Sequence, residues 1–301
     1  MEQVLRGYRH VNDVVFSDGA KRGRPAPRWV SAAAIHALVL VGTIVAPNVS
    51  RAEDPPLPVS GPGYIVTVGG YGLFEPTYDG SKRQEITGRP IFGLRTPGAK
   101  EWLDLPNDGL EYEFIETDTF RAGLVGNFRY QRDTSTIQPR GFKHFSSVNL
   151  SLEGGGFAEF WPAKWLRTRV ELRDAVLGAE GLVSDLSADV VTHPFNDRWT
   201  LTGGPRLSFA DQSYMQSYYG VSASQSTTSG LSAYHAQAGL RSYGAGTSAR
   251  YKWSDAWTTL GFVEYTRLAS EAGNSPVIDD RGSANQFTVG IGAKYSFFAN
   301  W

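Results

Sequence analysis

The sequence predicts an all-β protein, a transmembrane antiparallel β-barrel of about twelve strands, with ten as the alternative. Apolar and polar residues alternate along runs of mostly 9–13 residues. Strands of soluble proteins average about 5–6 residues, whereas a strand tilted across a bilayer needs roughly 9–11. Aromatic residues stand near the ends of several runs, as membrane-interface girdles require. A soluble sandwich or lipocalin-like barrel is the competing interpretation, but its strands would be shorter and would not need these terminal aromatics.

A signal peptide with an extended N-region is predicted over residues 1–52. A basic stretch at 21–28, an apolar run at 29–46 and the small residues Ser50 and Ala52 follow one another in the order of a cleaved secretory signal. The alternative is a membrane anchor that stays attached. We expect cleavage, because the run is short for a membrane span and only mildly apolar.

The rest of the chain divides into a short lead-in and the barrel. Residues 53–62 contain four prolines and predict a loose periplasmic lead-in, and residues 63–301 predict the barrel. Residues 53–301 contain no apolar stretch near 18 residues, so we expect no membrane-spanning helix there. A closed barrel is the remaining way to cross a bilayer with every backbone polar group satisfied.

Composition excludes several classes of function. The 301 residues include no Cys, which excludes disulfides, thiolate metal sites and Cys nucleophiles. The 29 Lys and Arg residues are balanced by 30 Asp and Glu residues. A nucleic-acid partner is therefore not expected, since it would require a strong basic excess.

The alternation that predicts strands is clearest at 120–130. Phe120, Leu124 and Phe128 share one face there, while Arg121 and Arg129 share the other. Bacterial single-chain barrels have even strand numbers, which favours twelve. The predicted strands are 64–72, 89–96, 110–116, 120–130, 148–160, 166–172, 181–192, 199–209, 239–253, 257–268 and 287–297, with 230–240 as an ambiguous further candidate.

The connections between these strands are of two kinds. Tight turns that suit the periplasmic rim are predicted at 161–164, 195–198 and 252–256. Longer stretches that suit the outer side are 75–88, 131–147, 212–229 and 269–285. Residues 211–221 are aromatic and not strand-like, so we expect a short helix there, at the barrel mouth or folded into the lumen.

Charged residues that alternate with apolar residues along the predicted strands are expected to face the lumen. Two interpretations are open: a mutually neutralising network that fills a narrow barrel, or a selectivity lining for a small solute. The mixed signs predict neither a strongly anion-selective nor a strongly cation-selective pore. The predicted lumen-facing residues are Arg121, Arg129, Glu153, Glu159, Arg167, Arg169, Glu171, Arg173, Asp185, Asp189, Arg206, Glu264 and Lys294.

No catalytic residue, cofactor or metal ligand is predicted. His144, His193 and His235 are not spaced as a metal motif, and we expect them to be solvated or lumen-facing. The sequence contains no G-x-S-x-G element, which makes a barrel hydrolase the weakest of the functional alternatives.

Four stretches in order resemble the MipA/OmpV family of outer-membrane proteins, the MltA-interacting proteins. The resemblance covers about 61–297 and implies insertion into the lipid of a Gram-negative outer membrane. It also implies a non-enzymatic scaffold joining a murein lytic transglycosylase to a penicillin-binding protein, with a porin-like channel or a surface-exposed adhesin or immunogen as alternatives. The four stretches are Gly69-Gly70-Tyr71-Gly72 running into Pro76-Thr77-Tyr78-Asp79-Gly80-Ser81, then Tyr218-Tyr219-Gly220-Val221, then Tyr265-Thr266-Arg267-Leu268 with Asn274-Ser275-Pro276-Val277, and the final Tyr295-Ser296-Phe297.

Overall fold

The structure, a computed structural model, describes six parts of the chain. These are residues 62–98, 102–103, 105, 108–129, 151–177 and 181–300. The predicted signal peptide 1–52, nearly all of the predicted lead-in 53–62 and the long connection 131–147 lie outside the described residues.

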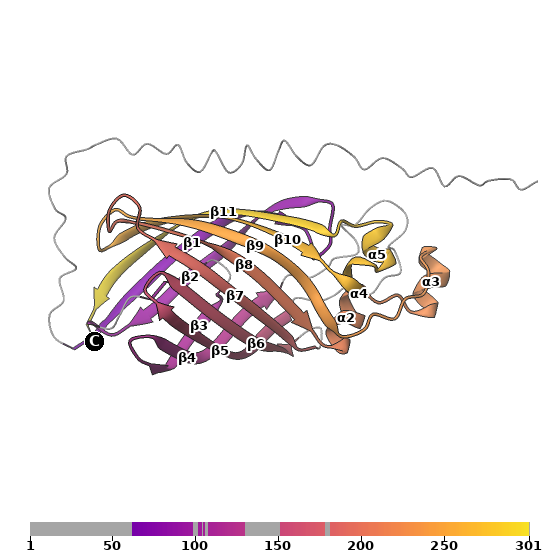
Figure 1. Cartoon of the computed structure of the whole chain (residues 1–301), viewed down its shortest axis with the longest axis horizontal. Helices are drawn as coiled ribbons and strands as arrows, with labels where there is room; N and C mark the ends of the chain where they lie inside the picture. The colour runs from indigo at the N-terminus through magenta and orange to yellow at the C-terminus, as the bar shows by residue number, and fades with distance from the viewer. Residues whose placement is uncertain are drawn as a thin grey trace, which may run out of the picture. The chain divides into compact units, whose positions relative to one another are not determined.

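The described residues form one curled antiparallel sheet of eleven strands (Figure 1), which confirms the predicted fold class. Its order is β2-β1-β11-β10-β9-β8-β7-β6-β5-β4-β3, so the first and last strands of the chain lie side by side. The pairing of β1 with β11 runs from Tyr64 opposite Ala299 to Phe74 opposite Val289. The strands are β1 Tyr64–Pro76, β2 Gln84–Arg95, β3 Leu110–Glu116, β4 Phe120–Arg129, β5 Ser151–Ala163, β6 Leu166–Leu177, β7 Val183–Thr192, β8 Trp199–Ala210, β9 Gly239–Lys252, β10 Trp257–Leu268 and β11 Asn285–Ala299.

The two edge strands of this sheet are β2 and β3, and the number of strands is eleven, where twelve or ten was predicted. Every neighbouring pair is antiparallel, so with eleven strands β2 and β3 run in the same direction although they follow each other in the sequence. The candidate at 230–240 does not supply a twelfth strand, because its described contribution before β9 is a single isolated bridge between Val221 and Tyr234.

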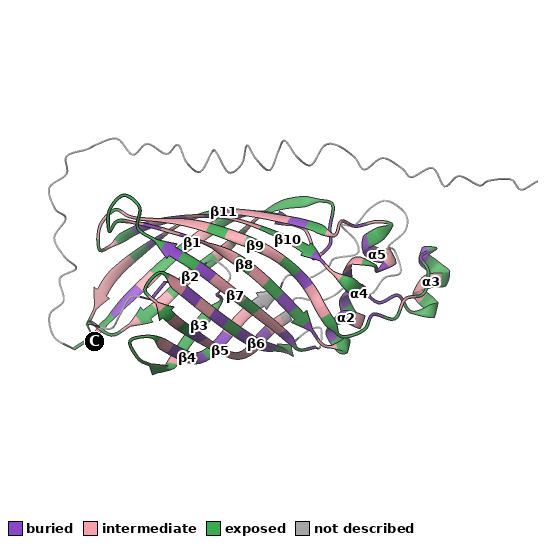
Figure 2. Ribbon diagram, viewed as in Figure 1, coloured by how far each residue is buried: buried purple, intermediate pink, exposed green. Residues whose placement is uncertain are grey.

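Burial alternates along the strands, as Figure 2 shows. In β6, Arg169, Glu171 and Arg173 are buried, while Val170 and Leu172, which alternate with them, are exposed. The strands thus bury charged side chains and expose large apolar ones, whereas a water-soluble protein does the opposite. An apolar outer surface of this kind is what a bilayer requires of a barrel.

Several element ends differ from the sequence prediction. β2 begins at Gln84, five residues earlier than predicted, and β6 continues to Leu177. The predicted tight turn at 161–164 is wrong in position, since β5 runs to Ala163 and β6 begins at Leu166. A register shift between Phe160 and Ala163 lets the strand continue through this stretch.

Four short helices follow β8 and β10 at one end of the sheet. The expected helix within 211–221 is present as α2, Gln212–Tyr219, and Asp211 caps it by accepting a hydrogen bond from the Tyr214 amide at 2.8 Å. The other three are α3 Ala223–Ser229, α4 Ser270–Gly273 and α5 Pro276–Asp279. None of the helices in the described ranges is long and apolar enough to span a bilayer.

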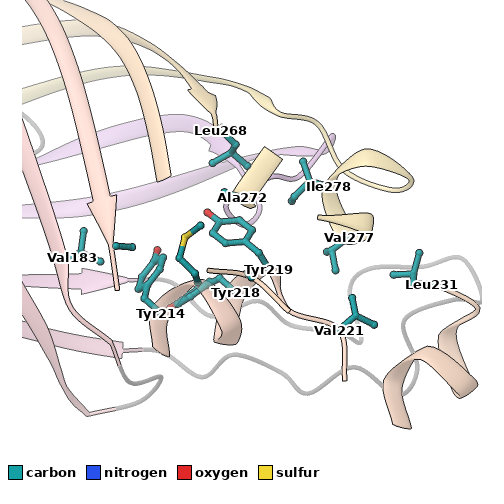
Figure 3. Close-up of a cluster of buried hydrophobic side chains, with 13 residues drawn as sticks. Val183, Tyr214, Tyr218, Tyr219, Val221, Leu231, Leu268, Ala272, Val277 and Ile278 are labelled. Atoms are coloured by element: carbon teal, nitrogen blue, oxygen red, sulfur yellow. The ribbon is translucent and has the colours of Figure 1, made fainter. Parts of the chain in front are cut away.

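Helices α2, α4 and α5 pack into an apolar cluster that covers the end of the sheet (Figure 3), and we call it the outer cap. Tyr214 and Tyr219 of α2, and Val277 and Ile278 of α5, are buried together with Leu268 at the end of β10. The tyrosines and aliphatic side chains thus tie the two long connections to each other and to the barrel wall.

Candidate functional site

A cluster of buried charges lies on the polar face of β4, β5 and β6. Arg121 donates to both oxygens of Glu159, with each nitrogen–oxygen distance 3.0 Å. Arg167 reaches Glu159 Oε2 at 2.7 Å. All three side chains have no exposed surface. A buried charge is tolerated only when it is paired and hydrogen-bonded, so these residues hold one another in place.

Strand register brings these charges together. Arg121 lies opposite Glu159 across β4 and β5, and Glu159 lies opposite Arg169 across β5 and β6. Arg167 lies opposite Asp189 across β6 and β7. Directly opposed residues on one face of an antiparallel pair are close enough to interact, which makes alternating signs a stabilising arrangement.

The cluster continues along the wall toward β8 and β10. Arg173 is paired with Glu153, Glu171 and Asp185. Arg173 separates two carboxylates of like charge, because Glu171 and Asp185 lie opposite each other in the register.

At the far side, Arg206 binds Asp189 at 2.7 Å and faces Glu264 at 3.9 Å. Lys294 is buried in β11, and the side chain of Arg129 lies outside the described residues. Each of the remaining predicted lumen-facing side chains is buried or half-buried and takes part in at least one ion pair with another of them.

Part of the cluster could not have been found from strand parity. Asp108 precedes β3 and accepts a hydrogen bond from Arg167 Nη2 at 2.7 Å. Leu103 and Leu105, in the connection between β2 and β3, pack against Val191 of β7. The Trp102 indole donates to Glu116 at 2.8 Å. These residues have no alternating pattern, so the sequence carries no local signal that the connection contacts the charged face.

Beside this cluster lies a polar cavity of about 290 Å³. Side chains of β2, β4, β6, β7, β8, β9 and β10 border it, so the curled sheet surrounds it. Arg89, Asp185 and Glu264 contribute charge, and Thr202 and Ser248 contribute hydroxyl groups that also bond each other at 2.6 Å.

A second group of polar residues ties the outer cap to the barrel. The Tyr219 hydroxyl donates to Asp79 Oδ2 at 2.5 Å, and Arg241 Nη1 reaches the same oxygen at 2.7 Å. Burial raises the pKa of Tyr219 well above its usual value, and the nearby Asp79 carboxylate adds to the shift. The phenol is therefore neutral and serves as a donor.

The histidines take no part in these clusters. His193 and His235 are exposed, and His144 lies outside the described residues. Within the described ranges, no three His, Asp or Glu side chains are arranged to hold a metal ion.

Comparison with known proteins supports a location in the outer membrane. The MltA-interacting protein of Escherichia coli (strain K12) is 28% identical over 146 residues, which are 48% of this chain and 56% of that protein. Outer membrane protein OmpV of Vibrio cholerae is 36% identical over 91 residues, 30% of this chain and 34% of that protein. The chain thus spans about half or less of the length of these relatives.

Solved structures of outer-membrane barrels are also similar. A NanC porin structure shares 11% identity over 77% of this chain and 98% of the porin, with a TM-score of 0.33. The N-terminal β-barrel domain of Pseudomonas aeruginosa OprF shares 6% identity over 79% of this chain and all of that domain, with a TM-score of 0.26.

The curled sheet, its apolar outer face and the named relatives define an outer-membrane β-barrel protein. Residues 68–297 match the family described as MltA-interacting protein MipA. The chain belongs to this family, which confirms the resemblance carried by its four sequence stretches.

Proposed function

We propose that this outer-membrane barrel is a non-enzymatic scaffold that joins a murein lytic transglycosylase to a penicillin-binding protein. One observation carries the proposal: the paired charges Arg121, Glu159 and Arg167 have no exposed surface and occupy the polar face of the wall. Arg167 also binds Asp108, which precedes β3. An interior occupied in this way suits a rigid support better than an open conduit. The function then belongs to the surfaces at the ends of the barrel.

Partner binding is assigned to the end that carries the tight turns. Phe195, in the turn between β7 and β8, is 73% exposed, and Trp165, in the turn between β5 and β6, is 57% exposed. Exposed aromatic side chains on short, well-supported turns are suitable anchors for a protein partner. The name of the Escherichia coli relative, MltA-interacting protein, agrees with a transglycosylase as one partner.

Cross-linking in whole cell envelopes tests the scaffold. The tagged protein is expected to retain both a lytic transglycosylase and a penicillin-binding protein. The variant Phe195→Asp is expected to lose one of them, while Thr227→Asp, on the exposed helix α3 at the other end of the barrel, keeps both. Retention of neither enzyme by the unaltered protein contradicts the proposal.

A porin-like channel is the second candidate, and the polar cavity favours it. Planar-bilayer recordings separate the two functions. A scaffold with an occupied interior gives no regular single-channel steps, whereas a channel gives steps of constant size. Steps from the pure protein, without co-purification of cell-wall enzymes, would replace the first proposal by the second.

A further inference from the structure

The polar cavity reaches the outer cap at one of its ends. Asp185, Ser208 and Arg241 border the cavity there. Arg241 Nη1 lies 3.4 Å from the hydroxyl oxygen of Tyr214 in the cap, and its guanidinium lies 5.7 Å from the centre of the Tyr214 ring. Tyr214 itself has no exposed surface. The cap therefore covers the cavity on the side of the long connections.

An ion pair crosses this end of the barrel. Asp79 follows β1, Arg241 belongs to β9, and β11 and β10 lie between these two strands in the sheet. Because neighbouring strands are about 4.8 Å apart, β1 and β9 are about 14 Å apart along the wall. Arg241 Nη1 and Asp79 Oδ2 are nevertheless 2.7 Å apart. The pair thus spans the concave side of the curled sheet instead of following its wall.

Asp79 joins two long connections to the wall, and we call Asp79, Tyr219 and Arg241 the crossbar. The oxygen of Asp79 that binds Arg241 also accepts a hydrogen bond from the Tyr219 hydroxyl of α2 at 2.5 Å. The amide of the next residue, Gly80, donates to Gln286 Oε1 in β11 at 3.2 Å. The connection after β1 is therefore fastened to α2, to β9 and to β11 over the end of the cavity.

We propose that the crossbar is a gate that closes the polar cavity at the capped end of the barrel. The side chains of Arg241 and Asp79 keep only 18% and 25% of their surface exposed, so solvent screens their attraction little. Charge-assisted hydrogen bonds are roughly twice as strong as neutral ones. Loss of the Asp79 charge therefore releases the connection after β1 and opens the cavity. This gate concerns access to the cavity and does not depend on the scaffold function.

Cysteine labelling of the purified full chain in detergent tests the gate. The chain has no native cysteine, so Thr266→Cys places a single thiol on the cavity lining, at a half-buried position of β10. The probe is fluorescein maleimide. Asp79→Asn keeps the size of the side chain but removes its charge, and we expect it to speed the labelling at least ten-fold. An unchanged rate in a folded Asp79→Asn variant overturns the proposal.

A matched control and a second variant complete the test. Asp279→Asn makes the same change at an exposed position of α5 in the cap and should leave the labelling rate unchanged. Arg241→Gln breaks the ion pair from β9 and should also speed the labelling at least ten-fold, so a result is available even if Asp79→Asn does not fold. Heat-dependent gel mobility identifies the folded variants. Equal acceleration by Asp279→Asn would indicate a general loosening of the cap and would contradict the gate.

Discussion

At the scale of single residues, the structure depends on charges that are buried only because they are paired. Arg169 illustrates this: it pairs with Glu111 at 2.8 Å and Glu171 at 2.7 Å, and its guanidinium lies 4.2 Å from the centre of the Phe157 ring. Removing one partner from a buried pair leaves the other charge uncompensated. Such a loss costs about 3–5 kcal/mol, far more than an exposed ion pair contributes.

The change Arg169→Leu is therefore expected to lower the free energy of unfolding by about 3–5 kcal/mol. Lys82→Leu, at an exposed position in the connection between β1 and β2, should change it by less than about 0.5 kcal/mol. Urea unfolding of both refolded variants in detergent measures the difference. Equal losses at the two positions would argue against a buried, paired Arg169.

Tyr234 predicts a pH dependence of the outer cap. Burial, together with a hydrogen bond from its hydroxyl to Glu271 Oε2 at 2.8 Å, raises its pKa to about 12. An unfolded tyrosine ionises near about 10. The raised pKa favours the neutral phenol in the folded cap, so this stabilisation is complete below about pH 10 and is lost as the pH rises through about 12.

The difference in tyrosinate absorbance between the unaltered protein and Tyr234→Phe measures that titration. We expect a midpoint near pH 12, and Glu271→Gln should lower it by removing the negative charge beside the phenol. A difference spectrum that titrates near pH 10 would contradict the hydrogen bond to Glu271.

At the scale of elements, glycines allow strands to pack closely where a side chain would collide. A Cβ on Gly204 of β8 would overlap the carbonyl oxygen of Ala188 on β7, whereas a Cβ on Gly203 would meet atoms no closer than 3.6 Å. The two neighbouring glycines therefore differ in what they require of the sheet. A pair of glycines within a strand indicates close backbone contact, but the sequence pattern does not separate the two positions.

Gly204→Ala is expected to destabilise the barrel by about 1–3 kcal/mol, because the backbone of β7 or β8 must move. Gly203→Ala should be close to neutral and serves as its control. The temperature at which each variant loses its folded mobility on gels measures both effects. A Gly204→Ala variant as heat-resistant as its control would disprove the close approach.

A strand could be predicted from the sequence where apolar and polar residues alternate along it. Residues 120–130 read as a strand because each second residue is apolar, and β4 occupies Phe120–Arg129. The four-residue helices α4 and α5 have too few residues for any helical period. Their position depends instead on packing against α2, which no local pattern encodes.

At the scale of the whole molecule, the pairing of β1 with β11 and the contacts of Asp108 depend on distant parts of the chain. An even number of strands was a reasonable expectation. The direction shared by β2 and β3 follows only from the pairing of the complete sheet. The charged cluster was largely predictable because it obeys parity. Asp108 was not, since the connection that carries it has no strand pattern.

The central claim is that β1 and β11 pair in the outer membrane, which joins the first strand of the barrel wall to the last. Thr67 and Ser296 lie opposite each other there, with their hydroxyl oxygens 2.8 Å apart, and the chain has no native cysteine to interfere. Oxidation of the double variant Thr67→Cys, Ser296→Cys in isolated outer membranes tests this seam most directly. We predict an intramolecular disulfide that changes gel mobility, and none for Thr67→Cys with Thr200→Cys on β8. A cross-link absent from the first pair and present in the second would contradict the account.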